Sequence, residues 1–503
     1  MLEDVDLARL DVLAGRVALF LKTGDVVTLS GPLGAGKTSF ARALITHLGD
    51  ADDVPSPTFA LMQRYETPRV TLTHCDFYRI EAPELDELGL DDALNEGALL
   101  IEWPERAGDW LPADRLDIVF DEMADPNLRR ITLTGHGRWV PRLDRLRALS
   151  RFVDKTSCAS ADAEYLQGDA SARSYARLVL PERSAILMNA PRQPDGPPIL
   201  DGKPYSALVH IAEDVTPFVA VAEALRACGM SAPKIDAFDL DEGFALLEDF
   251  GDRVFGPEMA RGTSQADLWG AAVDVLLALA IEPPPADLPI EGHAPYRLPD
   301  FDADAMLIEA SLLIDWLWPA LHGREAPKAL REEYLALWRP HLERAAKADP
   351  GWVLRDYHSP NLMWLPEREG TARVGLLDFQ DALKGPLAYD LVSLLQDARL
   401  DVPEALEREQ LDRYCAARSA QSGPFSADDF RTLYATLGAQ RNSKILGIFA
   451  RLAKRDGKRD YLAHIPRVAR YLERDLAHPA LGDLRAFYAR EFPTADDMPP
   501  IAP

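Results

Sequence analysis

The chain has 503 residues, with 81 acidic against 55 basic side chains and a formal net charge of -26 at pH 7. This length exceeds what one hydrophobic core normally supports, so we expect more than one domain. The negative charge repels a phosphate backbone at long range and excludes strong, direct binding of nucleic acid. Apolar residues make up 47% of the chain and charged residues 27%, which excludes a fibrous or disordered protein.

The N-terminal residues and the cysteines predict a cytoplasmic protein that does not enter a membrane. The start, MLEDVDLARL, is acidic and lacks the basic-then-apolar order of a signal peptide. No uncharged apolar run reaches the ~18 residues that a membrane span requires. Cys75, Cys158, Cys228 and Cys415 are too far apart for a zinc site or a redox pair, so we expect reduced thiols.

A phosphate-binding motif comes first in chain order. The run DVVTLS (25–30) predicts a buried strand, and KTSFARALITHLG (37–49) has apolar residues at helical spacing. The pattern G-x-x-x-x-G-K-[ST] is complete between them, and a structural turn that merely resembles it is the weaker interpretation. The predicted ATP-binding residues are Gly31, Gly34, Gly36, Lys37, Thr38 and Ser39.

This motif has a direct chemical interpretation. Amides of a glycine-rich turn converge on phosphate oxygens, and the following helix adds a favourable dipole. Lys37 neutralises the β- and γ-phosphates, and Thr38 offers a hydroxyl ligand to Mg2+.

Further strands are predicted at 70–77, 97–103, 115–120 and 129–135, which indicates an α/β layer. Asp76 and Glu102 stand at the ends of two of these strands. From the residues alone, each is either a metal ligand or a solvated charge.

The segments VPSPTFALMQRYE (54–66), LTHCDFYRIEAPELDELGL (72–90) and LLIEWPER (99–106) resemble the TsaE family, small bacterial ATPases of the tRNA threonylcarbamoyladenosine (t6A) pathway. The resemblance covers nearly all of residues 1–140. It implies that Thr38 and Glu102 hold Mg2+.

The resemblance also implies that Asp76 is a catalytic residue near the γ-phosphate and that Ser56–Phe59 act as a switch. It implies an ATPase subunit that supports t6A37 formation together with other subunits of the t6A-synthesis complex. The alternative is a nucleotide-gated assembly module with negligible turnover.

Glycine, proline and small polar residues between 136 and 160 predict a domain boundary, so we expect domains at 1–148 and 149–503. The basic segment 129–147 is interpreted as a solvated face, with contact to RNA as the alternative.

The second half begins with predicted strands at 175–180, 184–190 and 243–250 and a helix at 214–228, followed by a long, mainly helical stretch. In VLRDYHSPNLMW (353–364), two residues match D-x-x-x-x-N, the spacing by which a kinase catalytic loop presents a base and a Mg2+ ligand. The run VGLLDFQD that follows supplies another acid at a strand end. These three residues are Asp356, Asn361 and Asp378.

Residues 155–500 resemble the aminoglycoside phosphotransferase and choline kinase superfamily. Within it, GDASARSYAR, LLEDFGD and GLLDFQDALKGPLAYDLVSLLQD are similar to the AmgK-like kinases, which phosphorylate N-acetylmuramate and N-acetylglucosamine at the 1-position in cell-wall recycling. The fold expected for the whole chain is an α/β P-loop NTPase domain followed by a bilobal, protein-kinase-like (α+β) phosphotransferase domain.

The resemblance implies that Asp356 is the catalytic base, that Asn361 and Asp378 bind Mg2+, and that Asp390 braces the catalytic loop. For His358, a hydrogen bond that stabilises the loop is at least as good an interpretation as catalysis. The remaining residues it implies are Gly168, Arg173 and Glu248 for ATP, and Gln380, Asp381 and Arg441 for the substrate.

One departure from the kinase pattern concerns a cation. The strand at 184–191 has no Lys to grip the α- and β-phosphates, and the candidate substitutes are Arg173, Arg177 and Lys203. Glu223 would be the partner of the missing Lys, so its role is open.

The helical segment 438–458 carries Arg441, Lys444, Arg451 and Lys454, which we interpret as a solvated face. As an alternative, Arg441 or Lys444 binds the carboxylate of an acidic sugar.

The sequence thus predicts a bifunctional fusion that uses ATP and Mg2+: a t6A ATPase subunit and an anomeric amino-sugar kinase. The alternative acceptors are an aminoglycoside, another small alcohol or a protein. The sequence does not determine the oligomeric state or any coupling between the two halves.

Overall fold

The computed structural model of the chain describes residues 1–49, 61–80, 85, 87–166, 173–421 and 424–500. The chain forms two compact units, each described by itself below. The first comprises Met1–Pro191 and Asp236–Asp249, and the second Arg192–Ile235 and Phe250–Pro503. No helix within the described residues has the length and apolar content needed to cross a bilayer.

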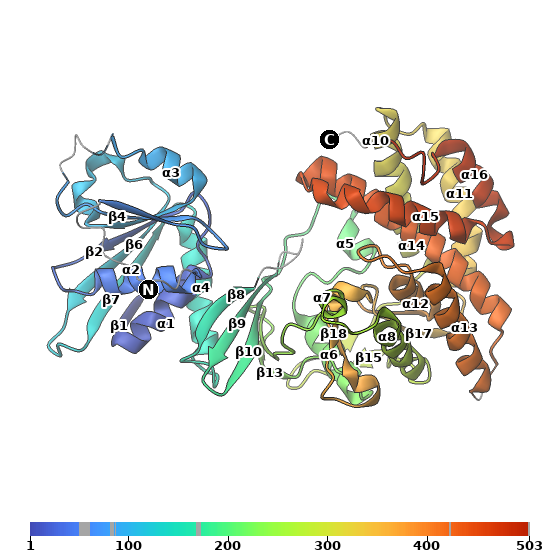
Figure 1. Cartoon of the computed structure of the whole chain (residues 1–503), viewed down its shortest axis with the longest axis horizontal. Coiled ribbons are helices and arrows are strands. Elements are labelled where there is room, and N and C mark those ends of the chain that lie inside the picture. The colour runs from blue at the N-terminus through green and yellow to red at the C-terminus, as the bar shows by residue number, and fades with distance from the viewer. Residues whose placement is uncertain (50–60, 81–84, 86, 167–172, 422–423, 501–503) are drawn as a thin grey trace. The chain divides into compact units, whose positions relative to one another are not determined.

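The first unit contains a seven-stranded sheet in the order β1-β7-β6-β2-β5-β4-β3 (Figure 1). The central strands β6, β2, β5 and β4 are parallel, and antiparallel strands cover both edges. The strand bounds are Leu2–Val5 (β1), Val26–Ser30 (β2), Met62–Tyr65 (β3), Leu72–Asp76 (β4), Ala98–Glu102 (β5), Arg115–Glu122 (β6) and Arg129–His136 (β7). The five predicted strands are present as β2, β4, β5, β6 and β7, whereas the short edge strands β1 and β3 were not predicted.

Four helices accompany this sheet: α1 (Leu7–Ala18), α2 (Lys37–His47), α3 (Leu90–Glu96) and α4 (Trp139–Val153). The side chain of Asp6 accepts a hydrogen bond from the Arg9 amide and caps α1. Strand β2 has four fully buried residues, as expected for a central parallel strand. Strand β2, the glycine loop and α2 therefore form the predicted strand, loop and helix unit.

The same unit holds a five-stranded sheet in the order β13-β14-β10-β9-β8. The pairs β8/β9, β9/β10 and β10/β14 are antiparallel. The strand bounds are Asp162–Leu166 (β8), Ser174–Leu180 (β9), Arg183–Asn189 (β10), Ile235–Asp239 (β13) and Phe244–Glu248 (β14).

Helix α4 belongs to the cores of both sheets. Trp139, Leu143 and Leu146 pack in the core beneath the seven-stranded sheet. One turn further on, Leu149 and Phe152 pack against the five-stranded sheet, where Phe152 stacks on Phe244 at 5.5 Å between ring centroids. The predicted domain boundary at 148/149 therefore falls inside a continuous helix.

Polar contacts reinforce this junction. The Arg145 guanidinium donates to the Asn189 side-chain oxygen at 2.6 and 2.9 Å. The Asp154 carboxylate, just after α4, accepts two hydrogen bonds from Arg9 at 2.9 and 2.7 Å and one from Arg16 at 2.7 Å. The two sheets are thus joined by packing as well as by chain connectivity.

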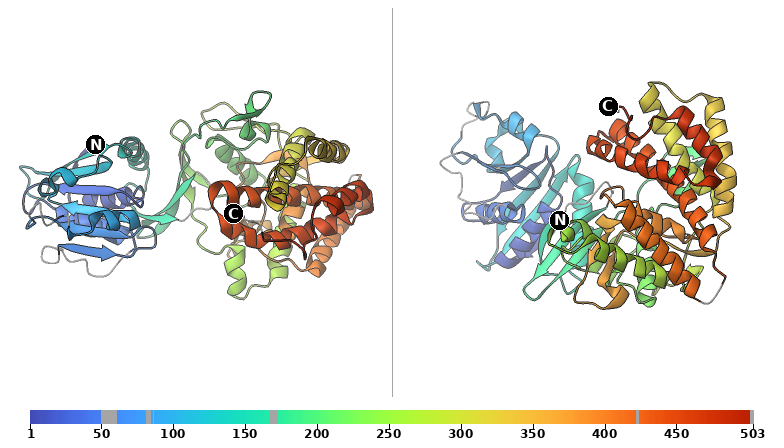
Figure 2. Two further views of the ribbon diagram at one scale, coloured as in Figure 1. Left: turned by 90° about the horizontal axis from the view of Figure 1, so that it is seen from above. Right: turned by 45° about the vertical axis from the view of Figure 1, so that its right-hand side comes forward.

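The second unit is mainly helical (Figure 2). Its helices are α5 (Tyr205–Leu208), α6 (Thr216–Ala227), α7 (Phe255–Ala260), α8 (Gln265–Leu279), α9 (Ala303–Leu312), α10 (Trp318–His322), α11 (Lys328–Ala345), α12 (Ala388–Leu395), α13 (Glu404–Ala420), α14 (Ala427–Asp456), α15 (Ile465–Leu476) and α16 (Gly482–Glu491). The longest, α14, packs against α9, α12 and α15.

Short strand pairs interrupt the helices. They are β11 (Pro198–Leu200) with β12 (Lys203–Pro204), β15 (Asp287–Leu288) with β16 (Tyr296–Arg297), β17 (Pro350–Val353) with β20 (Leu383–Pro386), and β18 (Leu362–Trp364) with β19 (Val374–Leu376). The last two pairs carry the second candidate site.

Candidate active sites

The phosphate-binding loop lies at the carboxyl end of the central strand β2. The buried Lys37 ammonium donates to the carbonyls of Gly31 and Pro32 at 2.7 and 2.9 Å, so its side chain folds back over the loop. Its nitrogen also lies 3.8 Å from the centroid of the Trp103 ring. Burial lowers the pKa of Lys37, while the carboxylates of Glu102, Glu105 and Asp76 act in the opposite direction.

Gly31 is required by close packing as well as by its backbone angle. Its φ is 140°, and a Cβ atom there would lie 2.4 Å from the Phe120 carbonyl oxygen on β6. Any larger residue would push the loop away from the sheet.

Two acids meet at the same sheet edge. Asp76 ends β4 and Glu102 ends β5, and the two residues are register partners in the parallel pair. The Thr38 hydroxyl donates to Glu102 at 3.1 Å, so α2 and β5 are joined at the mouth of the loop. Asp76 accepts a hydrogen bond from the Tyr78 amide at 3.0 Å.

His74 is a residue of this site that the sequence did not single out. Its ring is fully buried and its Nε2 donates to the second oxygen of Glu102 at 3.0 Å. The Glu102 carboxylate is therefore held through both oxygens, by His74 at one and by Thr38 at the other. The signal in the sequence was only a polar residue at a buried position of a strand.

A cluster of hydroxyl and carboxylate oxygens is the donor set that Mg2+ prefers. Thr38 and Glu102 fit such a site, with Asp76 beside them. The predicted switch, Ser56–Phe59, lies outside the described residues.

Most of the basic segment 129–147 is neutralised within the fold. Arg130 pairs with Asp4, Arg138 with Asp114, and Arg142 with the buried Asp25. A segment whose guanidinium groups are already paired offers fewer cations to an RNA backbone.

The second candidate site lies on the strand pairs β17/β20 and β18/β19. The catalytic loop leaves β17 and passes into β18, and the Leu377 amide donates to the Asn361 carbonyl at 2.9 Å. This bond places Asp378, the next residue, beside Asn361. The predicted D-x-x-x-x-N loop and the third acid are therefore brought together.

Hydrogen bonds within the loop set its shape. Asn361 donates its side-chain amide to the Asp356 carbonyl at 2.9 Å, and His358 donates from Nδ1 to the same oxygen at 2.9 Å. The donor side of the Asn361 amide thus serves the loop, which leaves its carbonyl oxygen as the atom suited to a cation. His358 forms the loop-stabilising hydrogen bond given above as one interpretation.

The predicted substrate residues Gln380 and Asp381 both form hydrogen bonds within the protein. The buried Gln380 amide donates to Asp378 at 2.9 Å, which positions that carboxylate. Asp381 accepts a hydrogen bond from the Ala212 amide at 2.7 Å and so fixes the chain segment before α6.

Asp390 stabilises the start of the loop at 353–364 through hydrogen bonds. Its buried carboxylate accepts hydrogen bonds from the Leu354 and Arg355 amides at 2.5 and 3.0 Å. Burial raises the pKa of Asp390 to about 7, although these amides act in the opposite direction. Arg355, the residue before Asp356, has a positive φ of 66° and is buried, with 4% of its surface exposed.

A buried charge cluster lies next to Asp356, the predicted base, and contains Arg355, Glu309 and Lys444. The Arg355 guanidinium pairs with Glu309 on α9 and donates to the Val209 carbonyl at 2.7 Å. Lys444 on α14 donates to the same Glu309 at 3.2 Å and to the Tyr389 hydroxyl at 2.8 Å. Burial raises the pKa of Glu309, but Lys444 and Arg355 outweigh it and hold the pKa below its ordinary value.

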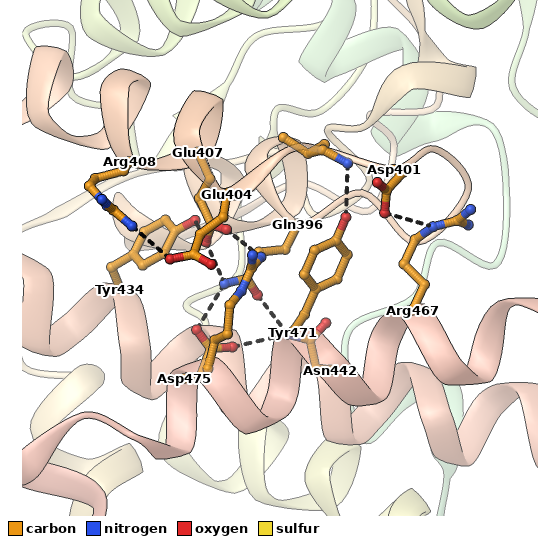
Figure 3. A network of polar contacts seen from close by, with 12 residues as sticks. Gln396, Asp401, Glu404, Glu407, Arg408, Tyr434, Asn442, Arg467, Tyr471 and Asp475 are labelled. Atoms are coloured by element: carbon orange, nitrogen blue, oxygen red, sulfur yellow. Dashed lines mark hydrogen bonds and ion pairs between the residues drawn. The ribbon is translucent and has the colours of Figure 1, made fainter. Parts of the chain in front are cut away.

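A second network of polar contacts surrounds the buried Gln396 (Figure 3). Gln396 donates to Glu407 at 2.9 Å and to Asp475 at 2.8 Å, and Asn442 donates to Gln396 at 2.6 Å. The next residue, Asp397, accepts a hydrogen bond from the Ser359 amide in the catalytic loop at 2.8 Å. The hydrogen bonds of Gln396 therefore help to fix Asp397, the acid that contacts the loop at 353–364.

The predicted ATP residues of the five-stranded sheet lie in the first unit. Arg177 on β9 donates to Asp249 at 2.7 and 3.2 Å, and this ion pair occupies its fork. Arg173 precedes β9 and Glu248 ends β14. Gly168 lies outside the described residues.

The other two residues discussed for the missing Lys, Lys203 and Glu223, lie in the second unit, and both are exposed.

The interpretation of 438–458 as a solvated face is wrong. Arg441 is only 3% exposed, and the side chain of Lys444 is 12% exposed and paired with Glu309. The polar residues around Arg441 face neighbouring helices because α14 is packed on several sides. Lys454 is exposed, as predicted.

Two known protein families match the chain in separate segments. The description "Threonylcarbamoyl adenosine biosynthesis protein TsaE" matches residues 6–131. The description "Phosphotransferase enzyme family" matches residues 162–429.

Curated proteins resemble the same two segments. An N-acetylmuramate/N-acetylglucosamine kinase of Caulobacter vibrioides is 39% identical over 359 residues, which cover 70% of this chain and 97% of the relative. A protein of the same name from Pseudomonas aeruginosa is 36% identical over 63% of this chain and 84% of its own length. The tRNA threonylcarbamoyladenosine biosynthesis protein TsaE of Rickettsia felis is 39% identical over 28% of this chain and 84% of its own length.

Proposed function

Because the chain belongs to the phosphotransferase enzyme family and, in its N-terminal part, to the TsaE family, we propose that one polypeptide performs two separate ATP-dependent reactions. The N-terminal part is an ATPase subunit for t6A37 formation in tRNA. The C-terminal part is a kinase for the anomeric hydroxyl of N-acetylmuramate and N-acetylglucosamine. A cytoplasmic location, where both substrates and reduced thiols occur, is part of the proposal.

In the ATPase part, the observation that carries the proposal is the meeting of Thr38, Asp76 and Glu102 at the glycine loop. The loop amides and Lys37 bind the phosphates, with Lys37 exchanging its two carbonyl contacts for phosphate oxygens. Thr38 and Glu102 hold Mg2+, which when bound neutralises phosphate charge. Asp76 accepts a proton from the water that attacks the γ-phosphorus, which releases ADP and phosphate.

This ATPase works with other subunits of the t6A-synthesis complex, which carry the transfer chemistry and the contact with tRNA. The test is phosphate release by the full chain, with and without these subunits. We expect turnover that depends on the subunits and is lost in Lys37→Ala. Absence of phosphate release together with unchanged t6A levels in Lys37→Ala would favour a nucleotide-gated assembly module.

In the kinase part, the observation that carries the proposal is the placement of Asp356, Asn361 and Asp378 on two adjacent strand pairs. Asp356 accepts the proton of the anomeric hydroxyl while the sugar oxygen attacks the γ-phosphorus of ATP; the bond between this phosphorus and the β–γ bridging oxygen breaks, and ADP leaves. Asn361 and Asp378 hold Mg2+. The hydrogen bonds from Asn361 and His358 to the Asp356 carbonyl keep the base in place, so the reaction depends on positioning.

Product analysis by 31P NMR tests the kinase. The full chain is incubated with MgATP and with N-acetylmuramate or N-acetylglucosamine in turn. We expect a phosphate signal coupled to the anomeric proton and none at the 6-position. Phosphate on an aminoglycoside but on neither sugar would overturn the assignment.

A further inference from the structure

Helix α14 carries three cations without an ion pair to a described acid: the buried Arg441, the partly buried Arg451 and the exposed Lys454. Arg451 is partly buried and forms no ion pair with any described residue, and its Nε is buried without a hydrogen-bond partner. Burial lowers the pKa of Arg451, and Arg455 adds to this effect. The nearby Asp456 is engaged with Arg455 through bonds of 2.7 and 2.9 Å. Such a guanidinium is stabilised by an anionic ligand.

Arg451 lies on the same face of α14 as a residue of the charge cluster next to the predicted base. Lys444 and Arg451 are separated by two helical turns (451 − 444 = 7 residues). Lys444 contacts Glu309, and Glu309 pairs with Arg355, the residue before Asp356. This face of α14 is therefore turned toward the catalytic loop.

A second chain segment leads from Arg451 to the predicted sugar residues. The Arg451 guanidinium lies 5.6 Å from the centroid of the Tyr205 ring, at the start of α5. After α5, the Val209 carbonyl accepts a hydrogen bond from Arg355 at 2.7 Å, and the Ala212 amide donates to Asp381 at 2.7 Å. The segment that begins beside Arg451 thus runs along the catalytic loop.

We propose that Arg451 binds the carboxylate of an acidic sugar and sets the preference between acidic and neutral acceptors. This inference rests on the proposed kinase function. N-acetylmuramate carries a lactyl carboxylate that N-acetylglucosamine lacks, and a guanidinium binds a carboxylate through two parallel hydrogen bonds. The candidates considered first do not suit this role, because Arg441 is buried and Lys444 is held by Glu309.

The test is the ratio of kcat/KM for N-acetylmuramate to kcat/KM for N-acetylglucosamine in the full chain. In Arg451→Met, we expect this ratio to fall by about tenfold or more, since a charge-assisted contact is lost for one sugar only. Arg451→Lys keeps the charge and should restore part of the ratio. The matched control is Lys454→Met, on the next turn of α14, where the side chain is exposed and the ratio should stay at its wild-type value.

A measurement on the unaltered protein keeps the inference testable if the variants fold poorly. The methyl ester of N-acetylmuramate has the same ring and side chain without the charge. We expect its KM to exceed that of the free acid, and the difference should shrink as ionic strength rises.

The outcomes separate the two proposals. If the unaltered protein phosphorylates neither sugar, the kinase assignment fails. If it phosphorylates both, but Arg451→Met changes both kcat/KM values equally or neither, the assignment stands and the role of Arg451 is refuted. Equal KM values for the ester and the free acid would refute it as well.

Discussion

At the residue scale, His358 in the loop between β17 and β18 and Asp378 just after β19 have different contacts. Asp378 offers a carboxylate that Gln380 positions, whereas His358 donates one hydrogen bond to a backbone carbonyl. Because phosphoryl transfer depends on the metal and its charge, Asp378→Ala should lower the kinase kcat by about a thousandfold or more. His358→Ala should lower it by about tenfold or less, since the Asn361 bond to the same carbonyl remains.

Steady-state kinetics with N-acetylglucosamine measures both values. A larger loss in His358→Ala than in Asp378→Ala would mean that the imidazole takes part in the chemistry. It would also remove the loop-stabilising interpretation of His358.

Glu258 gives a prediction for acid stability. Its buried side chain accepts hydrogen bonds from Arg253 at 2.7 and 3.0 Å and from Thr263 at 2.7 Å, and the Arg253 contact chiefly lowers the pKa of Glu258 to about 2. The unfolded chain takes up this proton near its ordinary pKa of 4.5. The stabilisation is therefore complete above pH 4.5 and is lost as pH falls toward 2.

Glu258→Gln should thus be less stable than the unaltered protein at neutral pH, and the difference should narrow as pH falls from 4.5 to 2. Denaturant unfolding at several pH values measures it. Glu404→Gln serves as the control, because that carboxylate is 62% exposed in its pair with Arg408. A difference that stays constant with pH would contradict the prediction.

At the scale of single elements, α4 stabilises two cores. Leu149 is 2% exposed against the five-stranded sheet, so Leu149→Ala should lower the free energy of unfolding of the first unit by about 2–5 kcal/mol. Val140, on the same helix, is 48% exposed, and Val140→Ala should change it by less than about 0.5 kcal/mol. Thermal and denaturant unfolding measure both. Equal changes in the free energy of unfolding for Leu149→Ala and Val140→Ala would mean that the packing of Leu149 does not stabilise the first unit.

Several elements could be predicted because local signals agree with the final contacts. The run 25–49 combines an apolar strand, a glycine turn and a helical pattern, and the structure has all three. The loop at 353–364 likewise brings Asp356, Asn361 and the neighbouring Asp378 together, as the motif predicted.

Other features could not be predicted because they depend on contacts between distant residues. Arg441 and Lys444 look like surface cations in the sequence. In the structure, the packing of α14 buries Arg441, and Lys444 forms an ion pair with Glu309. For His74 the sequence showed only a polar residue in a buried strand, and its role could not be predicted because it depends on Glu102, on the next strand of the sheet. The dual packing of α4 was missed because Gly137 before the helix and Pro141 in its first turn looked like a boundary.

For the whole molecule, the packing that α4 shares between the two sheets can be tested by cleavage. A protease site inserted between Thr156 and Ser157, just after α4, divides the chain without breaking the helix. Leu149, Phe152 and Arg145 should keep the pieces together through the five-stranded sheet. We expect co-elution in size-exclusion chromatography after cleavage.

The combined variant Arg145→Ala and Leu149→Ala should weaken this association and let the pieces separate at lower concentration. Separation of the unaltered pieces would contradict the shared packing. It would agree instead with two independent proteins joined only by the backbone.

The 15-residue helix α4 also limits how the gene can be divided for expression. A break before the helix strips Trp139 from the ATPase, and a break after it leaves Phe244 of the kinase sheet without its stacking partner. Two clones that each express well would have to carry overlapping ends, so that each product keeps its own copy of residues 139–153.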